Sequence, residues 1–136
     1  MSTSNNKCYI AGKITGINYK YAKSLFYSRL YEVLFMISLD SQNRVISTDI
    51  VCEGVTNSVN ISLRNILSIA LRTNAVSIIL AHNHPGGKAF PSEADRQTTD
   101  IIKNAPLSIN VRLIDHIIVA GDEYISMNFD LHILDG

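Results

Sequence analysis

The sequence predicts an α/β fold in which a mixed central sheet is flanked by helices. Three observations support this prediction. Two apolar segments, residues 31–40 and 45–55, are joined by the polar residues 41–44, as in an antiparallel hairpin. Residues 75–82 are apolar nearly throughout, which is typical of a strand at the centre of a sheet. Amphipathic segments alternate with these strands, so we expect helices on the faces of the sheet.

The N-terminal half contributes helices as well as the hairpin. Residues 7–12 predict a short strand. Residues 18–30 predict an amphipathic helix, because apolar and aromatic side chains recur at helical spacing, at Tyr19, Ala22, Phe26 and Leu30. A further helix is expected at residues 60–74, after the hairpin. Its apolar side chains share one face, and Asn60 or Ser62 could cap its start.

The C-terminal half continues from the apolar strand at 75–82. The next helix, residues 91–105, has Ser92 at its start, and Pro106 ends it. The remaining elements are one or two strands, a turn and a last short strand, at residues 109–120, 121–123 and 124–127.

Length and composition restrict the class of protein. A chain of 136 residues, 46% hydrophobic, predicts one domain over residues 1–136 with one core and excludes a disordered chain. No apolar run approaches the roughly 20 residues that span a bilayer, and the first residues lack the apolar stretch of a signal peptide. We therefore expect no membrane association and a cytoplasmic location. The sequence predicts no oligomeric state.

The balance of charge bears on nucleic-acid binding. The chain has no formal net charge, which argues against tight binding to phosphates. Residues 1–75 carry eight Lys/Arg against four Asp/Glu, a net +4, and residues 76–136 carry a net −4. A basic, aromatic patch is therefore conceivable at residues 18–29, with Lys20 and Lys23. The solvated face of an amphipathic helix is the favoured interpretation of that stretch.

The segment "AHNHPGGKAFPSEAD", residues 81–95, is where we expect chemistry. Side chains alternate on a strand, so His82 and His84 point to one face and Asn83 to the other. Two imidazoles at the end of a central strand make half of a metal site. Catalytic zinc sites use three protein ligands and leave one position for water. Asp95, in the first turn of the next helix, can supply the third ligand, and the resulting N/N/O set suits zinc.

Each part of this pattern also has a purely structural interpretation. Ser92 and Asp95 match a capping box, which satisfies backbone amides at a helix start, and for Ser-x-x-Asp alone the cap is favoured. His-x-His alone is a weak signal. The joint occurrence of the apolar strand, both histidines, the tight turn and the acidic helix start favours a metal site. Capping and catalysis are compatible for the same serine.

These residues resemble a known motif. His82-x-His84, seven residues and Ser92-x-x-Asp95 are similar to the signature of JAMM/MPN+ metallopeptidases. "AHNHPGG…PSEAD" resembles more closely the JAMM-like domain of bacterial RadC proteins, historically named for DNA repair. The segments "YEVLFMISLDSQNRVI", "VSIILAHNHP" and "LIDHIIV" agree with it. The resemblance covers residues 28–127 and implies a JAMM/MPN fold, which is three-layered and cytidine-deaminase-like.

The resemblance also implies roles. His82, His84 and Asp95 would hold one Zn²⁺ per chain. Glu32, in "YEVLF", matches the family's upstream glutamate, which acts as general acid/base. Ser92 would stabilise the oxyanion of the tetrahedral intermediate. Without the resemblance, the favoured interpretation of Glu32 is a structural residue at a strand edge.

Some positions depart from the family pattern or leave its meaning open. Gly86 occupies the place of a usual serine. We also expect no helix-hairpin-helix segment of the kind that precedes this domain in longer RadC proteins. The lack of that segment weakens a direct DNA role. Asp115 and His116 match the family, and either a role beside the metal or a hydrogen-bonded pair at a strand end is conceivable, the latter being favoured.

Three functions remain at this point. The leading hypothesis is a zinc-dependent metallopeptidase that cleaves a peptide or isopeptide bond in an unidentified peptide or protein partner. The second is a DNA-associated role in repair or recombination. The third is a metal-binding module that recognises a partner without catalysis. The sequence does not name the substrate.

Overall fold

The computed structural model describes residues 19–27, 29–54, 59–104 and 110–127. Helices and strands alternate along this part of the chain, as the sequence predicts. In chain order they are α2 (Tyr19–Ser24), β1 (Val33–Leu39), β2 (Val45–Glu53), α3 (Val59–Thr73), β3 (Ser77–Asn83), α4 (Glu93–Asn104), β4 (Arg112–Ala120) and β5 (Glu123–Ser126).

The strands of the described residues form a five-stranded sheet in the order β2-β1-β3-β4-β5. β1 pairs antiparallel with both β2 and β3, β3 pairs parallel with β4, and β4 pairs antiparallel with β5. The predicted mixed sheet and the predicted hairpin are therefore confirmed. β3 lies in the middle, as its apolar sequence predicted, and along its length only His82 is more than marginally exposed. The fold class is α/β.

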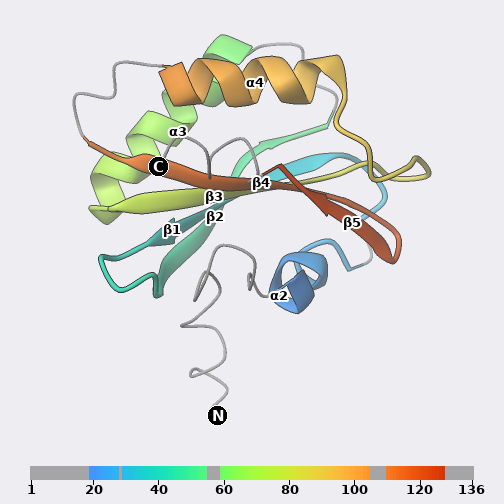
Figure 1. The fold of residues 1–136 in the computed structure, drawn as a ribbon, viewed down its shortest axis with the longest axis horizontal. Coiled ribbons are helices and arrows are strands. Elements are labelled where there is room, and N and C mark those ends of the chain that lie inside the picture. The colour runs from blue at the N-terminus through green and yellow to red at the C-terminus, as the bar shows by residue number, and fades with distance from the viewer. Residues whose placement is uncertain (1–18, 28, 55–58, 105–109, 128–136) are drawn as a thin grey trace.

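Helices cover both faces of the sheet, which gives three layers (Figure 1). α3 and α4 lie on one face and α2 on the other. The alternation along β1 supplies both cores. Val33, Phe35 and Ile37 pack on the α2 side, while Leu34 and Met36 pack on the α3 side. Burial of these apolar side chains on both faces is the main force that holds the layers together.

The predicted helix at residues 18–30 is wrong in its length. α2 ends at Ser24, and tighter turns follow, in which the amides of Leu25, Phe26 and Tyr27 donate to the carbonyls three residues back. Phe26 remains buried, edge-on to Phe35 at 5.4 Å between ring centroids. Leu30 is 88% exposed, so it does not share the buried face with Ala22 as predicted.

The other boundaries differ by a few residues. Where the sequence predicted one or two strands over 109–120, the described residues form one strand, β4, which begins at Arg112, and α3 begins at Val59, one residue before the predicted start. The predicted hairpin turn is present. The Asn43 amide donates to the Asp40 carbonyl, the Arg44 amide donates to the Asp40 side chain, and Asn43 has a positive φ of 62°. The predicted strand at 7–12 and the stop at Pro106 lie outside the described residues, as do the side chains of Asn60 and Ser62.

Candidate metal centre

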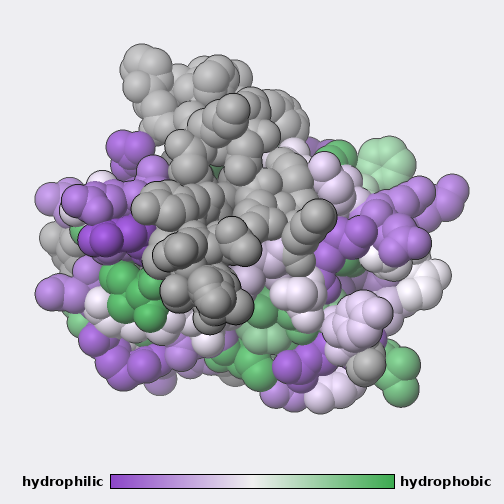
Figure 2. All heavy atoms as spheres, turned by 90° about the horizontal axis from the view of Figure 1, so that it is seen from below, coloured by the Kyte–Doolittle hydropathy of each residue, from purple (hydrophilic) through white to green (hydrophobic). Residues whose placement is uncertain are grey.

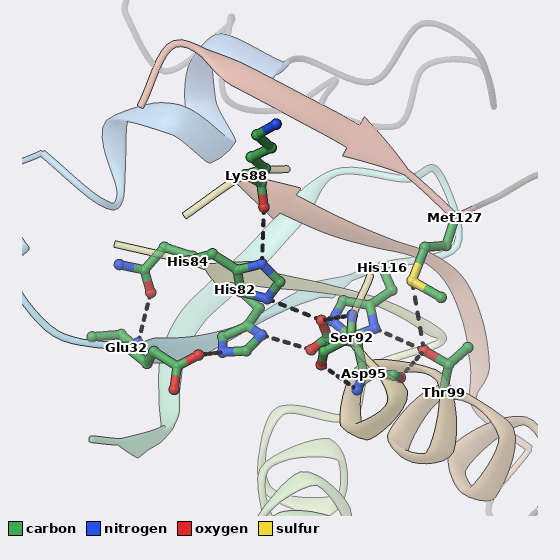
Figure 3. A network of polar contacts seen from close by, with 11 residues as sticks. Glu32, His82, His84, Lys88, Ser92, Asp95, Thr99, His116 and Met127 are labelled. Atoms are coloured by element: carbon green, nitrogen blue, oxygen red, sulfur yellow. Dashed lines mark hydrogen bonds and ion pairs between the residues drawn. The ribbon is translucent and has the colours of Figure 1, made fainter. Parts of the chain in front are cut away.

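The end of β3 brings His82 and His84 to one side of the sheet, as alternation predicts. Their rings are nearly perpendicular, with centroids 5.1 Å apart. Asn83 points to the opposite side, where it is buried and bonds to the backbone before β1. The two imidazoles are therefore available together at the exit of the central strand (Figure 3).

The turn after β3 fixes the second imidazole. The Gly87 amide donates to the His84 carbonyl at 3.0 Å, and Gly86 has a φ of +72°. Proline followed by a residue with positive φ is the pattern of a type II turn, in which glycine is strongly favoured at that position. The chain then passes back over His84, and the Lys88 carbonyl accepts a hydrogen bond from His84 Nδ1 at 3.1 Å.

The start of α4 holds Asp95 against both histidines. The Asp95 amide donates to Ser92 Oγ at 3.0 Å, and the Ser92 amide donates to Asp95 Oδ2 at 2.8 Å. This reciprocal pair is the predicted capping box. Because the cap fixes the side chain, Asp95 Oδ1 lies 2.8 Å from His82 Nδ1 and Oδ2 lies 3.0 Å from His84 Nε2.

Glu32 reaches the same place from the neighbouring strand. Leu34 in β1 pairs with His82 in β3, so the residues just before β1 lie beside the end of β3. Glu32 Oε1 is 3.4 Å from His82 Nε2, and the Glu32 side chain is 33% exposed, against 4% for Asp95. The structure thus brings together all five predicted site residues, with Glu32 on the more open side and Asp95 buried.

The ring nitrogens of the two histidines face oxygen atoms that can only accept. His84 has the Lys88 carbonyl on one nitrogen and Asp95 on the other, and His82 lies between Asp95 and Glu32. Two neutral imidazoles bring only two protons for these four nitrogens. The cluster therefore lacks two positive charges, which two protons or one divalent cation would supply.

The donor set also suits such a cation. Glu32, His82 and His84 offer one ligand atom each within 4.8 Å of one another, and so do His82, Asp95 and His116. Imidazole nitrogen and carboxylate oxygen are borderline ligands that fit Zn²⁺. The predicted ligands His82, His84 and Asp95 span these two groups. The residues present therefore fit a zinc ion.

The electrostatics of the buried part follow from its contacts. Burial opposes ionisation of Asp95, but hydrogen bonds from His82 and the Ser92 amide outweigh it, so the pKa of Asp95 lies well below its ordinary value. Burial lowers the pKa of His116 to about 4, against the opposing influence of Asp95. Asp95 is thus an anion and His116 a neutral imidazole over the physiological range.

Sequence reasoning missed two contributors to this site. Asn83 Oδ1 accepts from the Val33 amide at 2.7 Å, and Asn83 Nδ2 donates to the Tyr31 carbonyl at 3.1 Å, so Asn83 holds the backbone on both sides of Glu32. Thr99 donates to the Asp95 carbonyl at 2.9 Å and lies 2.7 Å from His116 Nδ1. Strand alternation, which places Asn83 on the face opposite the two histidines, was a usable signal for Asn83. No local sequence pattern distinguished Thr99.

Asp115 has a different environment from the histidines. Its carboxylate accepts from the His116 amide at 2.7 Å and from Ser126 Oγ at 2.6 Å. The first bond lies within β4 and the second joins β4 to β5. Asp115 and His116 are hydrogen-bonded, as the favoured interpretation expects, but they lie in the middle of β4 and not at a strand end. His116, by contrast, points toward α4 and the candidate metal centre (Figure 3).

Comparison with known proteins agrees with this arrangement. The family model described as "RadC-like JAB domain" matches residues 16–131. The chain belongs to this family. The mixed five-stranded sheet with its helices is consistent with the fold of this family.

Two relatives from Vibrio have names that describe no activity. A "UPF0758 protein" of Vibrio atlanticus is 39% identical over 106 residues, which are 78% of this chain and 47% of the relative. A "UPF0758 protein" of Vibrio cholerae matches with the same identity and coverage. The chain spans about half the length of these relatives. Among the described residues, no helix is long and apolar enough to cross a membrane.

Proposed function

We propose that this chain is a zinc-dependent hydrolase that cleaves a peptide or isopeptide bond. One observation carries the proposal. The imidazoles of His82 and His84 face oxygen atoms that accept hydrogen bonds, and they lie between the buried carboxylate of Asp95 and the more exposed carboxylate of Glu32. When bound, zinc supplies Lewis acidity, which polarises a carbonyl and lowers the pKa of a water ligand to about 7. His82, His84 and Asp95 would hold it.

Glu32 is suited to proton transfer. It approaches His82 from the open side and is partly exposed, so its carboxylate can meet a nucleophilic water and a substrate. A carboxylate in this place can take the proton of the attacking water and give it to the leaving amine. Asp95 is too enclosed for this role, since its oxygens lie within 3.0 Å of His82 and His84 and accept from the Ser92 amide.

Ser92 is suited to stabilise developing negative charge. Its Oγ accepts from the Asp95 amide, which leaves the hydroxyl proton to be donated elsewhere. The side chain is exposed at the start of α4, beside the ligands. A hydroxyl donor in this position can bind an oxyanion, and the helix start adds a favourable local field.

A groove beside His84 supports a polypeptide substrate. It has a volume of about 880 Å³ and runs between the α2 region and the end of β3, with Phe26, Tyr27, Leu30, Asn83 and His84 in its walls. Tyr27 and Leu30 are largely exposed. Figure 2, viewed from the α2 side, shows hydrophobic residues in separate areas among hydrophilic ones. The groove is also lined by Lys23 and Arg29, so it can receive an extended chain with both apolar and acidic side chains.

The direct test combines metal analysis with one substitution. Elemental analysis should find about one zinc per chain in the zinc-loaded wild type and none in His82→Ala. Glu32→Gln should keep the zinc but lose cleavage of a proteome-derived peptide library, measured by mass spectrometry, and a chelator should abolish wild-type cleavage. Glu123→Gln, at the exposed start of β5, is the matched control and should cleave normally.

Two outcomes would overturn the proposal. Cleavage that survives both the chelator and Glu32→Gln would reject the assigned chemistry. A wild-type chain that takes up no metal even with added zinc would reject the site itself, and Ser92 and Asp95 would then be a helix cap only.

A further inference from the structure

His116 lies one level deeper in the sheet than His82. It is on β4 opposite Leu80 in the parallel pairing with β3, and its ring centroid is 6.4 Å from that of His82. The side chain is 1% exposed, and it points to the same face as the candidate metal centre. A buried imidazole in this place requires an explanation, because the proposed hydrolysis does not use it.

The contacts of Thr99 fix the tautomer of His116. A hydroxyl has one proton, and the Asp95 carbonyl can only accept, so the Thr99 hydroxyl donates to that carbonyl. When Thr99 donates to that carbonyl, it accepts from His116, and this arrangement has the proton of the imidazole on Nδ1. On an imidazole protonated at Nδ1 alone, Nε2 carries a lone pair and no proton.

This Nε2 atom is a buried acceptor without a hydrogen-bond partner among the described residues. Buried polar atoms in native proteins nearly always have a partner, and an exception calls for a water or an ion. The neighbours of His116 favour the ion. A ligand atom of His116 lies within 4.8 Å of ligand atoms of His82 and Asp95, and Asp95 is an anion.

We propose that His82, Asp95 and His116 form an alternative, inner position for the single divalent cation, which shares His82 and Asp95 with the predicted ligands and lies behind the outer group of Glu32, His82 and His84. The inner set offers two imidazoles and one carboxylate, which suits Zn²⁺ and similar borderline metals. Two of its three members are buried, whereas all members of the outer group are partly exposed. The inner position is thus the more enclosed one, and His82 and Asp95 connect it with the predicted ligands. This inference rests on the metal-binding part of the proposed function and not on hydrolysis.

Nitrogen NMR of the histidine side chains tests the inference directly. In the metal-free protein, long-range ¹H–¹⁵N spectra should show His116 protonated on Nδ1. On titration with zinc, the Nε2 resonance of His116 should shift to the range of a metal-bound nitrogen. If the Nε2 resonance of His116 keeps its metal-free chemical shift at saturating zinc, the inner position is wrong. A buried water would then be the hydrogen-bond partner of Nε2.

Substitutions separate the inner from the outer position. His84→Ala should still bind one zinc, and adding His116→Asn should weaken that binding by at least about tenfold, the lower range for loss of a partner at a metal site. Asparagine at position 116 keeps a hydrogen-bond donor near the place of Nδ1 but removes Nε2. The control Thr99→Val removes the partner of Nδ1 and keeps the Nε2 atom of His116. If His84→Ala and the double variant bind zinc equally well, the inner position is wrong. If no histidine responds to zinc, the proposed function fails with it.

Discussion

At the scale of single residues, the site depends on which atoms can accept and which can donate. His82 and His84 lie among oxygens that only accept, and this deficit of positive charge is a stronger argument for a cation than the spacing of the motif. Strand alternation and the helix start pointed to His82, His84 and Asp95 from the sequence alone, whereas Glu32 and the catalytic role of Ser92 were predicted only through the resemblance to the JAMM/MPN+ motif. The sequence could not predict the partners of Asn83, which come from residues some fifty positions earlier.

Asn83→Ala should lower hydrolysis without weakening zinc binding. The substitution removes both bonds that hold the backbone around Glu32 and leaves a buried amide and carbonyl unpaired, at a cost of about 1–3 kcal/mol in stability. Misplacement of Glu32 should reduce kcat. The measurement is kcat and zinc affinity on the same preparation.

Asn65→Ala is the matched control for Asn83→Ala. Asn65 Nδ2 also donates to a backbone carbonyl, that of Val51 in β2, at 2.8 Å, but it does not bond the residues on either side of Glu32. It should destabilise the fold and leave kcat unchanged. Equal effects of the two variants on kcat would show that Asn83 acts on stability alone.

At the scale of elements, the hydrophobic pattern of the sequence predicted which helices and strands exist more accurately than it predicted the residues at which they begin and end. The central strand was predicted because Ser77–Asn83 is apolar enough to be buried on both faces. The helix at 18–30 was predicted too long, because helical spacing also continues through the turns after Ser24. Phe26 fits either geometry and remains in the core, so its apolarity did not reveal where the helix ends.

The start of α4 combines a cap with a proposed catalytic group, and two substitutions at Ser92 separate them. Ser92→Ala should cost about 1 kcal/mol of stability, whereas Ser92→Gly should cost only a few tenths. Both remove the hydroxyl, so both should reduce cleavage by a similar factor, on the order of 100-fold. Chemical denaturation and peptide cleavage measure the two effects. If the loss of cleavage is instead larger in Ser92→Ala than in Ser92→Gly, in proportion to the loss of stability, Ser92 acts only as a helix cap.

At the scale of the whole molecule, the buried polar cluster sets how stability depends on pH. The pKa of His116 is about 4 in the fold, against an ordinary value of 6.5. Between these values the unfolded chain binds a proton that the folded chain does not. The pKa of Asp95 is also lowered, so its contribution is present above about 3.8 and is lost as the pH falls further.

We therefore expect the metal-free protein to lose stability between pH 6.5 and pH 4, by up to about 3 kcal/mol through His116. Above pH 6.5 this contribution is fully present. His116→Asn should flatten the dependence in that window. Urea denaturation at pH 7 and pH 5, with a chelator present, measures the slope. A slope that is equal in wild type and variant would contradict the role given to His116.

The two faces of β3 have a consequence for how this domain can evolve. His82 and His84 serve the metal centre on one side, and Asn83 holds the backbone beside Glu32 on the other. Gain or loss of one residue within the strand would exchange these sides and disable both tasks at once. Lineages can thus vary this strand by substitution, while changes in length are tolerated in exposed turns such as residues 41–43.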